Sequence, residues 1–193
     1  MPYDLLTIGH SNLQAERFMA LLTSAGVTAI GDVRSVPFSR WCPWFSGKAL
    51  AERLAGERIA YVALGDALGG RPRDPTLYRD GVADYEAMAA RPEFAAGLAR
   101  VLDESAHHRV CLLCAEREPL DCHRCLLVGR SLAERGLKLG HIRVDGSIEA
   151  HAATEDRLLT LACGDADLFS NRAERLAHAY RRRAHAVAAR LKA

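Results

Sequence analysis

The feature that most constrains the fold is an alternation of short apolar runs with amphipathic stretches of helical period. Each apolar run is long enough for one strand, and each intervening segment has room for one helix. This pattern is typical of βαβ units around a parallel sheet. We therefore predict an α/β fold, a three-layer sandwich with a mainly parallel five-stranded sheet plus a C-terminal helix. The predicted strands cover residues 5–8, 27–33, 59–62, 110–114 and 139–144.

Capping residues mark several of the predicted helices. The first helix is predicted to start at Ser11 in a capping box and to end before Gly26, and a second starts near Ser46. Asp121 is the predicted N-cap of the helix that follows the fourth strand. Further helices are predicted over residues 84–90 and 92–105, and a long one from about residue 165 with Leu168, Leu176, Tyr180, Val187 and Leu191 on one side.

Charge is unevenly distributed along the chain. The formal net charge is +2, whereas residues 165–193 contain seven Lys or Arg against three Asp or Glu. We predict a near-neutral α/β core domain over residues 1–150 and a basic helical appendage over 151–193, packed on the same domain. A basic tail is compatible with nucleic-acid binding, so a nucleic-acid partner stays open.

The cysteines are expected to be reduced. The opening apolar run follows Asp4 instead of a basic flank, and no apolar run approaches the 18 residues of a membrane span. We therefore expect a cytoplasmic protein without a membrane partner. In that compartment the six cysteines would serve reactivity or metal binding in preference to disulfides.

Candidate site residues follow the predicted strands, where open α/β sheets bind ligands. The candidates for chemistry are Cys114, Cys122, His123, Glu116 and His10. Arginines in two long loops, residues 34–45 and 64–81, together with Lys48 near a helix N-terminus, suit a small anionic ligand. Aromatic residues such as Trp41, Trp44 and Phe45 could stack a nucleobase. The candidates for ligand binding are Ser11, Asp32, Arg34, Ser39, Arg40, Lys48, Gly69, Gly70, Arg124 and His141. Each also has a structural alternative, such as Ser11 as a cap or Asp32 as an ion-pair partner of Arg34.

Residues 111–125, CLLCAEREPLDCHRC, contain two Cys-x-x-Cys pairs. A four-cysteine zinc site is disfavoured, because Cys111 and Cys114 would point to opposite faces of a strand. Cys114 and Cys122 instead flank one βα turn, where a helix N-terminus, His123 and Arg124 favour a thiolate. They could act as a nucleophile, as a disulfide pair, or as ligands of a metal together with a histidine. We assign no metal ligand set and no cofactor from the sequence.

Several motifs resemble one family. They are TIGHS at 7–11, DVRS-x-P-x-S at 32–39, FS-x-K-x-L at 45–50, LGG at 68–70, LCAE-x-x-P-x-x-CHR at 113–124 and GHI at 140–142. In this order and over roughly residues 4–145, they resemble the domain of unknown function 488 family. The resemblance implies an intracellular α/β domain with no generally assigned activity, and it supports the positions named above. Cys42, Cys111, Cys125 and Cys163 fall outside the family pattern.

Our preferred hypothesis is a thiol-dependent enzyme that acts on a small anionic or nucleotide-like substrate. Cys114 or Cys122 would be the nucleophile or ligand, and His10 or His123 the proton carrier. The alternatives are a non-catalytic module that binds nucleic acid or another partner, and a Cys/His metal-dependent site.

Overall fold

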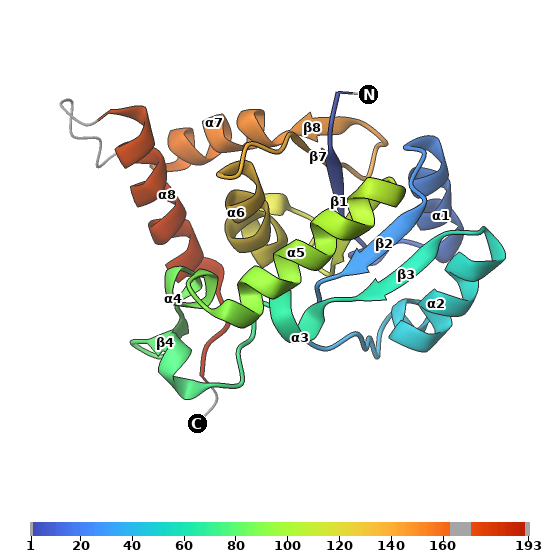
Figure 1. Ribbon diagram of the computed structural model, residues 1–193, viewed down its shortest axis with the longest axis horizontal. Helices are drawn as coiled ribbons and strands as arrows, with labels where there is room; N and C mark the ends of the chain where they lie inside the picture. The colour runs from blue at the N-terminus through green and yellow to red at the C-terminus, as the bar shows by residue number, and fades with distance from the viewer. Residues whose placement is uncertain (1, 163–170, 192–193) are drawn as a thin grey trace.

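The centre of the molecule is a six-stranded sheet in the order β3-β2-β6-β1-β7-β8, parallel except for the last pair. The computed structural model describes residues 2–162 and 171–191, and it confirms the predicted α/β fold (Figure 1). The prediction of five strands missed the three-residue β8, which returns antiparallel beside β7 after a turn at Gly146. The strands are β1 (Leu5–Gly9), β2 (Ala29–Asp32), β3 (Ala60–Ala63), β6 (Val110–Cys114), β7 (Leu139–Ile142) and β8 (Ile148–Ala150).

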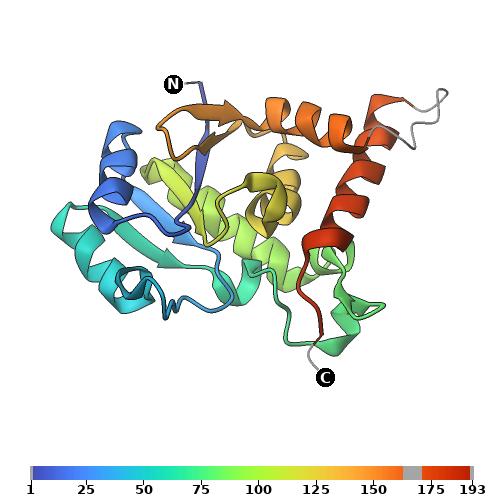
Figure 2. The same cartoon turned by 180° about the vertical axis from the view of Figure 1, so that it is seen from behind.

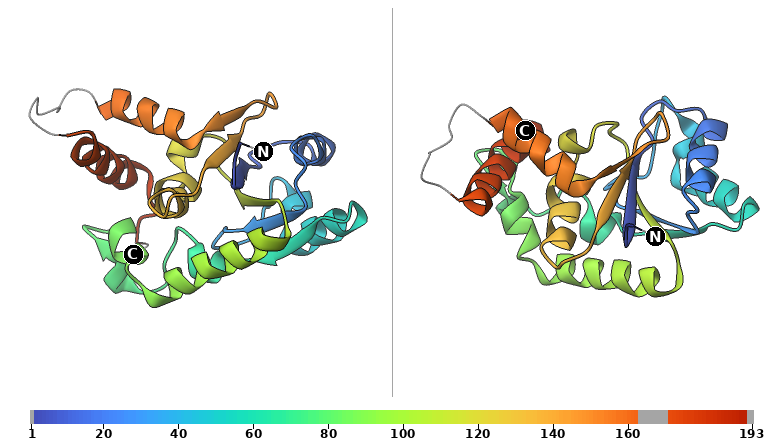
Figure 3. Two further views of the ribbon diagram at one scale, coloured as in Figure 1. Left: turned by 45° about the horizontal axis from the view of Figure 1, so that its top comes forward. Right: turned by 90° about the horizontal axis from the view of Figure 1, so that it is seen from above.

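Helices cover both faces of this sheet, as the right-hand view of Figure 3 shows for α1 and α2 on one side and α6 on the other. β1, β2, β6 and β7 are buried along their whole length, which explains their nearly continuous apolar sequences. The α-helices are α1 (Ala15–Ser24), α2 (Gly47–Gly56), α3 (Gly65–Leu68), α4 (Tyr85–Ala89), α5 (Pro92–His107), α6 (Arg130–Ala133), α7 (His151–Ala162) and α8 (Arg172–Val187).

Two apolar cores result. One lies between the sheet and α1 and α2 and contains Phe18, Leu22 and Leu50. The other lies on the opposite face and extends to α5, α7 and α8, with Val101 and Leu158 among its members.

The shorter elements are 3₁₀ turns η1 (Pro43–Phe45), η2 (Pro75–Leu77) and η3 (Pro119–Asp121), a π-helical turn η4 (Arg124–Gly129), and a hairpin of β4 (Tyr78–Arg79) and β5 (Val82–Ala83).

Two predicted helix starts are wrong. Ser11 has a φ of 46° and its hydroxyl donates to Asn12, because the chain makes a turn after β1 before α1 begins at Ala15. Asp121 ends η3 and pairs with Arg183, and the backbone at Cys122 is extended. Ser46 does stand at the N-terminus of α2 as predicted.

The C-terminal segment packs on the rest of the molecule. α8 starts at Arg172, after a capping box formed by Asn171 and Glu174. The predicted start near residue 165 and the predicted apolar position Leu168 lie outside the described residues. After α8 the chain runs along the β4–β5 hairpin (Figure 2), where the N–H of Ala83 donates to the carbonyl of Ala189 at 2.8 Å. Within the described ranges, no helix combines the length and apolar composition needed to cross a membrane.

Candidate active site

The carboxyl ends of β1, β2 and β6 meet around one cavity. The register places Gly9 opposite Cys114 and Asp32 opposite Leu113, so the residues that follow these strands converge. A cavity of about 350 Å³ opens there. Its polar lining consists of His10, Arg34, Ser35, Ser39, Arg71, Cys114, Glu116, Asp121 and His123, and its other lining residues include Val36, Phe38, Gly70, Tyr85, Val187 and Ala189.

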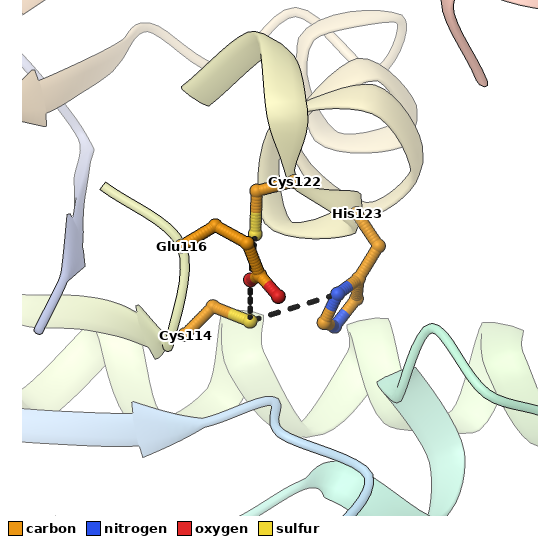
Figure 4. A group of neighbouring side chains, drawn as sticks. All are labelled: Cys114, Glu116, Cys122 and His123. Atoms are coloured by element: carbon orange, nitrogen blue, oxygen red, sulfur yellow. Dashed lines mark hydrogen bonds between the residues drawn. The ribbon is translucent and has the colours of Figure 1, made fainter. Parts of the chain in front are cut away.

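Four side chains form a cluster at this cavity (Figure 4). The thiols of Cys114 and Cys122 each lie 3.0 Å from the same oxygen, Oε2 of Glu116. The Sγ of Cys114 is 3.6 Å from Nδ1 of His123. Nε2 of His123 donates to the carbonyl oxygen of Val33 at 2.9 Å, which leaves Nδ1 as the nitrogen that faces the thiol. We call Cys114, Glu116, Cys122 and His123 the dithiol cluster.

Arg124 holds the loop that carries this cluster. It is 1% exposed, and its guanidinium donates to the carbonyls of Glu116 and Arg117 at 2.5 and 3.0 Å. Its backbone N–H lies 3.4 Å from the sulfur of Cys122. A Cβ on Gly9 would overlap the Glu116 carbonyl, so glycine is what allows the loop to approach β1.

The pKa values within the cluster move in different directions. Burial, followed by the neighbouring Cys122, raises the pKa of Cys114 well above its ordinary value. Burial also acts on Cys122, but the hydrogen bond with Cys114 and the charge of Arg124 outweigh it and hold the pKa of Cys122 well below its ordinary value. Burial and Cys122 raise the pKa of Glu116. Burial opposes protonation of His123, yet its contact with Cys122 raises the pKa of the imidazole. These shifts make His123 the stronger base and Cys122 the more acidic thiol.

A second buried group supports one side of the cavity. The Arg34 guanidinium binds Asp32 at 2.5 Å and donates to His10 Nε2 at 3.2 Å. Tyr61 adds a hydroxyl bond to Asp32 at 2.8 Å. Nδ1 of His10 donates to the Ser11 carbonyl, so both ring nitrogens are occupied. Burial lowers the pKa of His10 to about 4, and the role of His10 as a proton carrier stays a prediction.

Several predicted ligand-binding residues do not face the cavity. Asp32, Arg124 and His141 are buried in hydrogen bonds of their own. Arg40 stacks on the exposed ring of Trp41, and Lys48 is 92% exposed beside Glu52. Ser11 lies in its turn outside the lining. Gly69 lines a neighbouring cavity instead. Gly70 packs against His123, and a Cβ added to Gly70 would lie 2.5 Å from Cγ of His123.

The cavity of the dithiol cluster is also lined by residues that are not among the predicted site residues. Arg71 is exposed at the cavity, and no carboxylate of the described residues forms an ion pair with it. The only sequence signal for Arg71 as a ligand-binding residue is its place among the arginines of the loop over residues 64–81. Phe38 is 69% exposed and also lines the cavity. Val187 is the last residue of α8 and Ala189 follows that helix. The sequence predicted Val187 only as an apolar position of the C-terminal helix.

Among the residues that the structure describes, two groups of donors could hold a metal ion. The donor atoms of the dithiol cluster lie within 4.8 Å of one another, and so do those of Cys125, His141 and His151. Cys111 belongs to the opposite core from Cys114. This placement agrees with the argument against a four-cysteine site.

Comparison with known proteins gives one relationship. No curated protein and no solved structure matches the chain. The family model described as "Domain of unknown function DUF488" matches residues 14–130, which is more than half of the 193 residues. The matched stretch contains β2, β6 and the whole dithiol cluster, whereas β1 and the segment after Arg130 lie outside it. The chain therefore belongs to the DUF488 family.

Proposed function

We propose that the protein is a thiol-dependent enzyme that acts on a small anionic substrate bound in the cavity of the dithiol cluster. The observation that carries this proposal is the pairing of Cys114, a residue that lines the cavity, with a histidine nitrogen 3.6 Å from its sulfur. The other nitrogen of His123 is fixed by the Val33 carbonyl. A nucleophile, a base and a group that orients the base are the parts of covalent catalysis.

The proposed reaction has two steps. In the first step the sulfur of Cys114 bonds to an electrophilic carbon or phosphorus of the substrate while the bond from that atom to the leaving group breaks, and the thiol proton passes through Nδ1 of His123 to the leaving group. In the second step the hydroxyl of a water molecule bonds to the same atom, the bond to sulfur breaks, and the proton of that water restores the thiol. The raised pKa of Cys114 makes a base necessary, and the raised pKa of His123 suits it to that role. Glu116 accepts from both thiols and orients them.

The cavity lining favours a ligand that combines an anion with a flat apolar group. Arg71 offers a guanidinium, and the hydroxyls of Ser35 and Ser39 lie on the same lining. Val36, Phe38 and Trp41 are 63, 69 and 80% exposed within one short loop, and the first two line the cavity. Exposed aromatic side chains beside a cation are suited to stacking a nucleobase. A nucleoside monophosphate is therefore the ligand class that we propose.

The first experiment maps thiol reactivity under native conditions with iodoacetamide and mass spectrometry. We expect Cys114 to be alkylated fastest, because its sulfur lines the cavity, and AMP to protect it. Adenosine lacks the phosphate group and inorganic phosphate lacks the nucleoside, so each of them alone should protect Cys114 less than AMP does. R71A should remove protection by AMP, whereas C42S, at a buried thiol outside the cavity, should leave the labelling of Cys114 unchanged. A Cys114 that reacts no faster than Cys111 would refute the proposal.

A metal-dependent site is the second candidate, and charge favours it. Two thiols and one carboxyl surround a single imidazole, so both sulfurs ionise easily only beside a cation. Zn²⁺ with two thiolates and a neutral histidine has zero net charge, and the bond from His123 to Val33 is of the kind that supports metal-bound histidines. Under this candidate, purified protein contains about one zinc per chain. C114S and H123Q lose the zinc while C42S keeps it, and the bound metal blocks alkylation until a chelator is added.

The nucleic-acid alternative has less support. Arg172, Arg181 and Arg183 of α8 form ion pairs with Asp156, Glu86 and Asp121, so part of the basic charge of the tail is neutralised on the molecule itself. The alternative predicts binding of DNA or RNA that weakens steeply with salt. A binding assay at two ionic strengths tests it directly.

A further inference from the structure

We infer that a chain of hydrogen bonds from Glu155 to Arg124 positions the dithiol cluster, and that His151 and Tyr180 are positioning residues of the site. The inference deepens the proposed function and rests on it for the identity of the site. The chain itself stands on contacts between side chains that are distant in sequence. Its residues come from β1, β7, α7, α8 and the π-helical turn η4.

Five contacts make up the chain. Nε of Arg124 lies 3.4 Å from Oγ1 of Thr7, and that hydroxyl lies 2.8 Å from Nδ1 of His141. Nε2 of His141 is 3.0 Å from Nδ1 of His151. Nε2 of His151 is 3.0 Å from the hydroxyl of Tyr180, which is in turn 3.0 Å from Oε1 of Glu155.

The two ends fix the direction of every donor. A guanidinium can only donate, so Thr7 accepts from Arg124, and a neutral His141 that donates through Nε2 accepts the proton of the Thr7 hydroxyl at Nδ1. His141 must then donate through Nε2 to His151, and His151 through Nε2 to Tyr180. Tyr180 donates to the carboxylate of Glu155, which can only accept when ionised. Both histidines are thus neutral Nε2–H tautomers, in agreement with the burial that lowers their pKa values.

Burial makes this chain costly to break. Thr7, His141 and Arg124 are at most 1% exposed, and His151 is 4% exposed. A buried donor or acceptor that loses its partner is penalised more than a solvent-exposed one. Because every bond donates in the direction from Arg124 to Glu155, each bond polarises the next, with the cation at the donor end and the carboxylate at the acceptor end. Removal of one hydroxyl is therefore expected to affect the whole chain.

Arg124 connects the chain to the site. The same guanidinium that contacts Thr7 holds the carbonyls of Glu116 and Arg117, and its backbone N–H contacts the sulfur of Cys122. A shift of Arg124 would move the loop on which the Glu116 carboxylate is placed. Tyr180 and His151 therefore act on the thiols through Arg124 and do not contact a substrate.

A metal ion is the competing explanation for part of this arrangement. The sulfur of Cys125 and one ring nitrogen of each of His141 and His151 lie within 4.8 Å of one another. A bound metal would need lone pairs on both nitrogens, and the His141–His151 hydrogen bond would be lost. Hydrogen-bond partners occupy both nitrogens of each ring without a metal, and this favours the chain.

The direct test is the tautomer of each histidine by long-range proton–nitrogen NMR of the intact wild-type protein, with metal analysis of the same sample. We expect His141 and His151 as neutral Nε2–H tautomers with slowly exchanging ring protons. An Nδ1–H tautomer at either ring, or a metal ion bound through both, overturns the inference. This measurement does not depend on the proposed function.

The second test asks whether the chain of hydrogen bonds affects the reactivity of the dithiol cluster. Y180F removes one hydroxyl, and we expect the rate of Cys114 alkylation to change about threefold to tenfold, the equivalent of one hydrogen bond. Y78F, which removes a hydroxyl bonded to the distant Pro72 carbonyl, should leave the rate unchanged. E155Q retains an acceptor for Tyr180 and should behave like wild type, whereas E155A removes the acceptor and should resemble Y180F. E155A therefore provides the same test if Y180F folds poorly.

The outcomes separate the two proposals. An unchanged alkylation rate in both Y180F and E155A overturns the positioning role. A wild-type Cys114 that does not react at all counts against the proposed function, while the tautomers still decide whether the chain exists.

Discussion

Acidification from pH 7.5 to 5 should destabilise the protein through three buried histidines, His10, His141 and His151. Burial lowers the pKa values of His10 and His151 to about 4 and that of His141 well below its ordinary value. A histidine with a lowered pKa stays neutral in the folded state, whereas the unfolded chain takes up a proton near pH 6.5. Their contribution to stability is therefore complete above pH 6.5 and is lost progressively as the pH falls towards 4.

The magnitude follows from the linkage between proton binding and unfolding. Between pH 7.5 and 5, a group with a pKa of 6.5 in the unfolded chain and about 4 in the folded one costs about 2 kcal/mol. His10 and His151 together account for about 4 kcal/mol, a large part of the total stability of a typical domain, and the lowered pKa of His141 adds to the loss in the same direction. Glu116 and Glu155 oppose this loss, because their raised pKa values let the folded state take up protons. The raised pKa of His123 adds nothing below pH 6.5, where both states hold its proton.

The assay is urea unfolding at half-unit pH intervals, compared between wild type and single variants. H151Q should reduce the slope of unfolding free energy against pH by about one proton between pH 6 and 5, roughly 1.4 kcal/mol per unit. H178Q, at an exposed histidine of α8, should leave the slope as in wild type. Equal slopes in H151Q and wild type would refute the reasoning, because His151 would then be protonated in the folded state as well.

Three further predictions concern single positions. D32A should lower the unfolding free energy measured in urea by about 3–5 kcal/mol, because it leaves the buried Arg34 guanidinium without its anion; a loss below 1 kcal/mol would contradict the buried pair. G70A places a Cβ 2.5 Å from Cγ of His123, so it should cost about 1–3 kcal/mol and slow Cys114 alkylation, and an unaltered rate would show that His123 is not held there. K48A should change stability by less than about 0.5 kcal/mol in the same urea assay, since its ion pair is exposed; it should also leave protection of Cys114 by AMP intact.

The arrangement of strands could be predicted because it depends on composition over several residues. Continuous apolar runs mark strands buried on both faces, and they identified β1, β2, β6 and β7 to within a few residues. A shorter apolar run identified the half-buried edge strand β3. β8 has only three residues, with Ile148 as its one large apolar side chain, so it left no comparable signal. Ser11 and Asp121 failed as helix caps because the chain after β1 and after β6 turns before it becomes helical.

The candidate site was predictable only in outline. The sequence placed His10, Arg34 and Cys114 after strands, and parallel register brings such residues together. It could not distinguish arginines that face the cavity from those that hold the backbone, because Arg124 and Arg71 differ in burial and not in residue type. Contacts between β7 and α8, such as those that join His141 through His151 to Tyr180, depend on tertiary packing that no local pattern encodes.

The strand order has a consequence for synthesis on the ribosome. Among the described residues, β1 pairs with β6 and β7, and β2 pairs with β3 and β6. β1 therefore has no sheet partner until Val110–Cys114 has left the exit tunnel, long after β1 itself. Pairing between strands so far apart in sequence is slow to form. Nascent chains that end before β6 would thus expose the apolar β1 and depend on chaperones for protection.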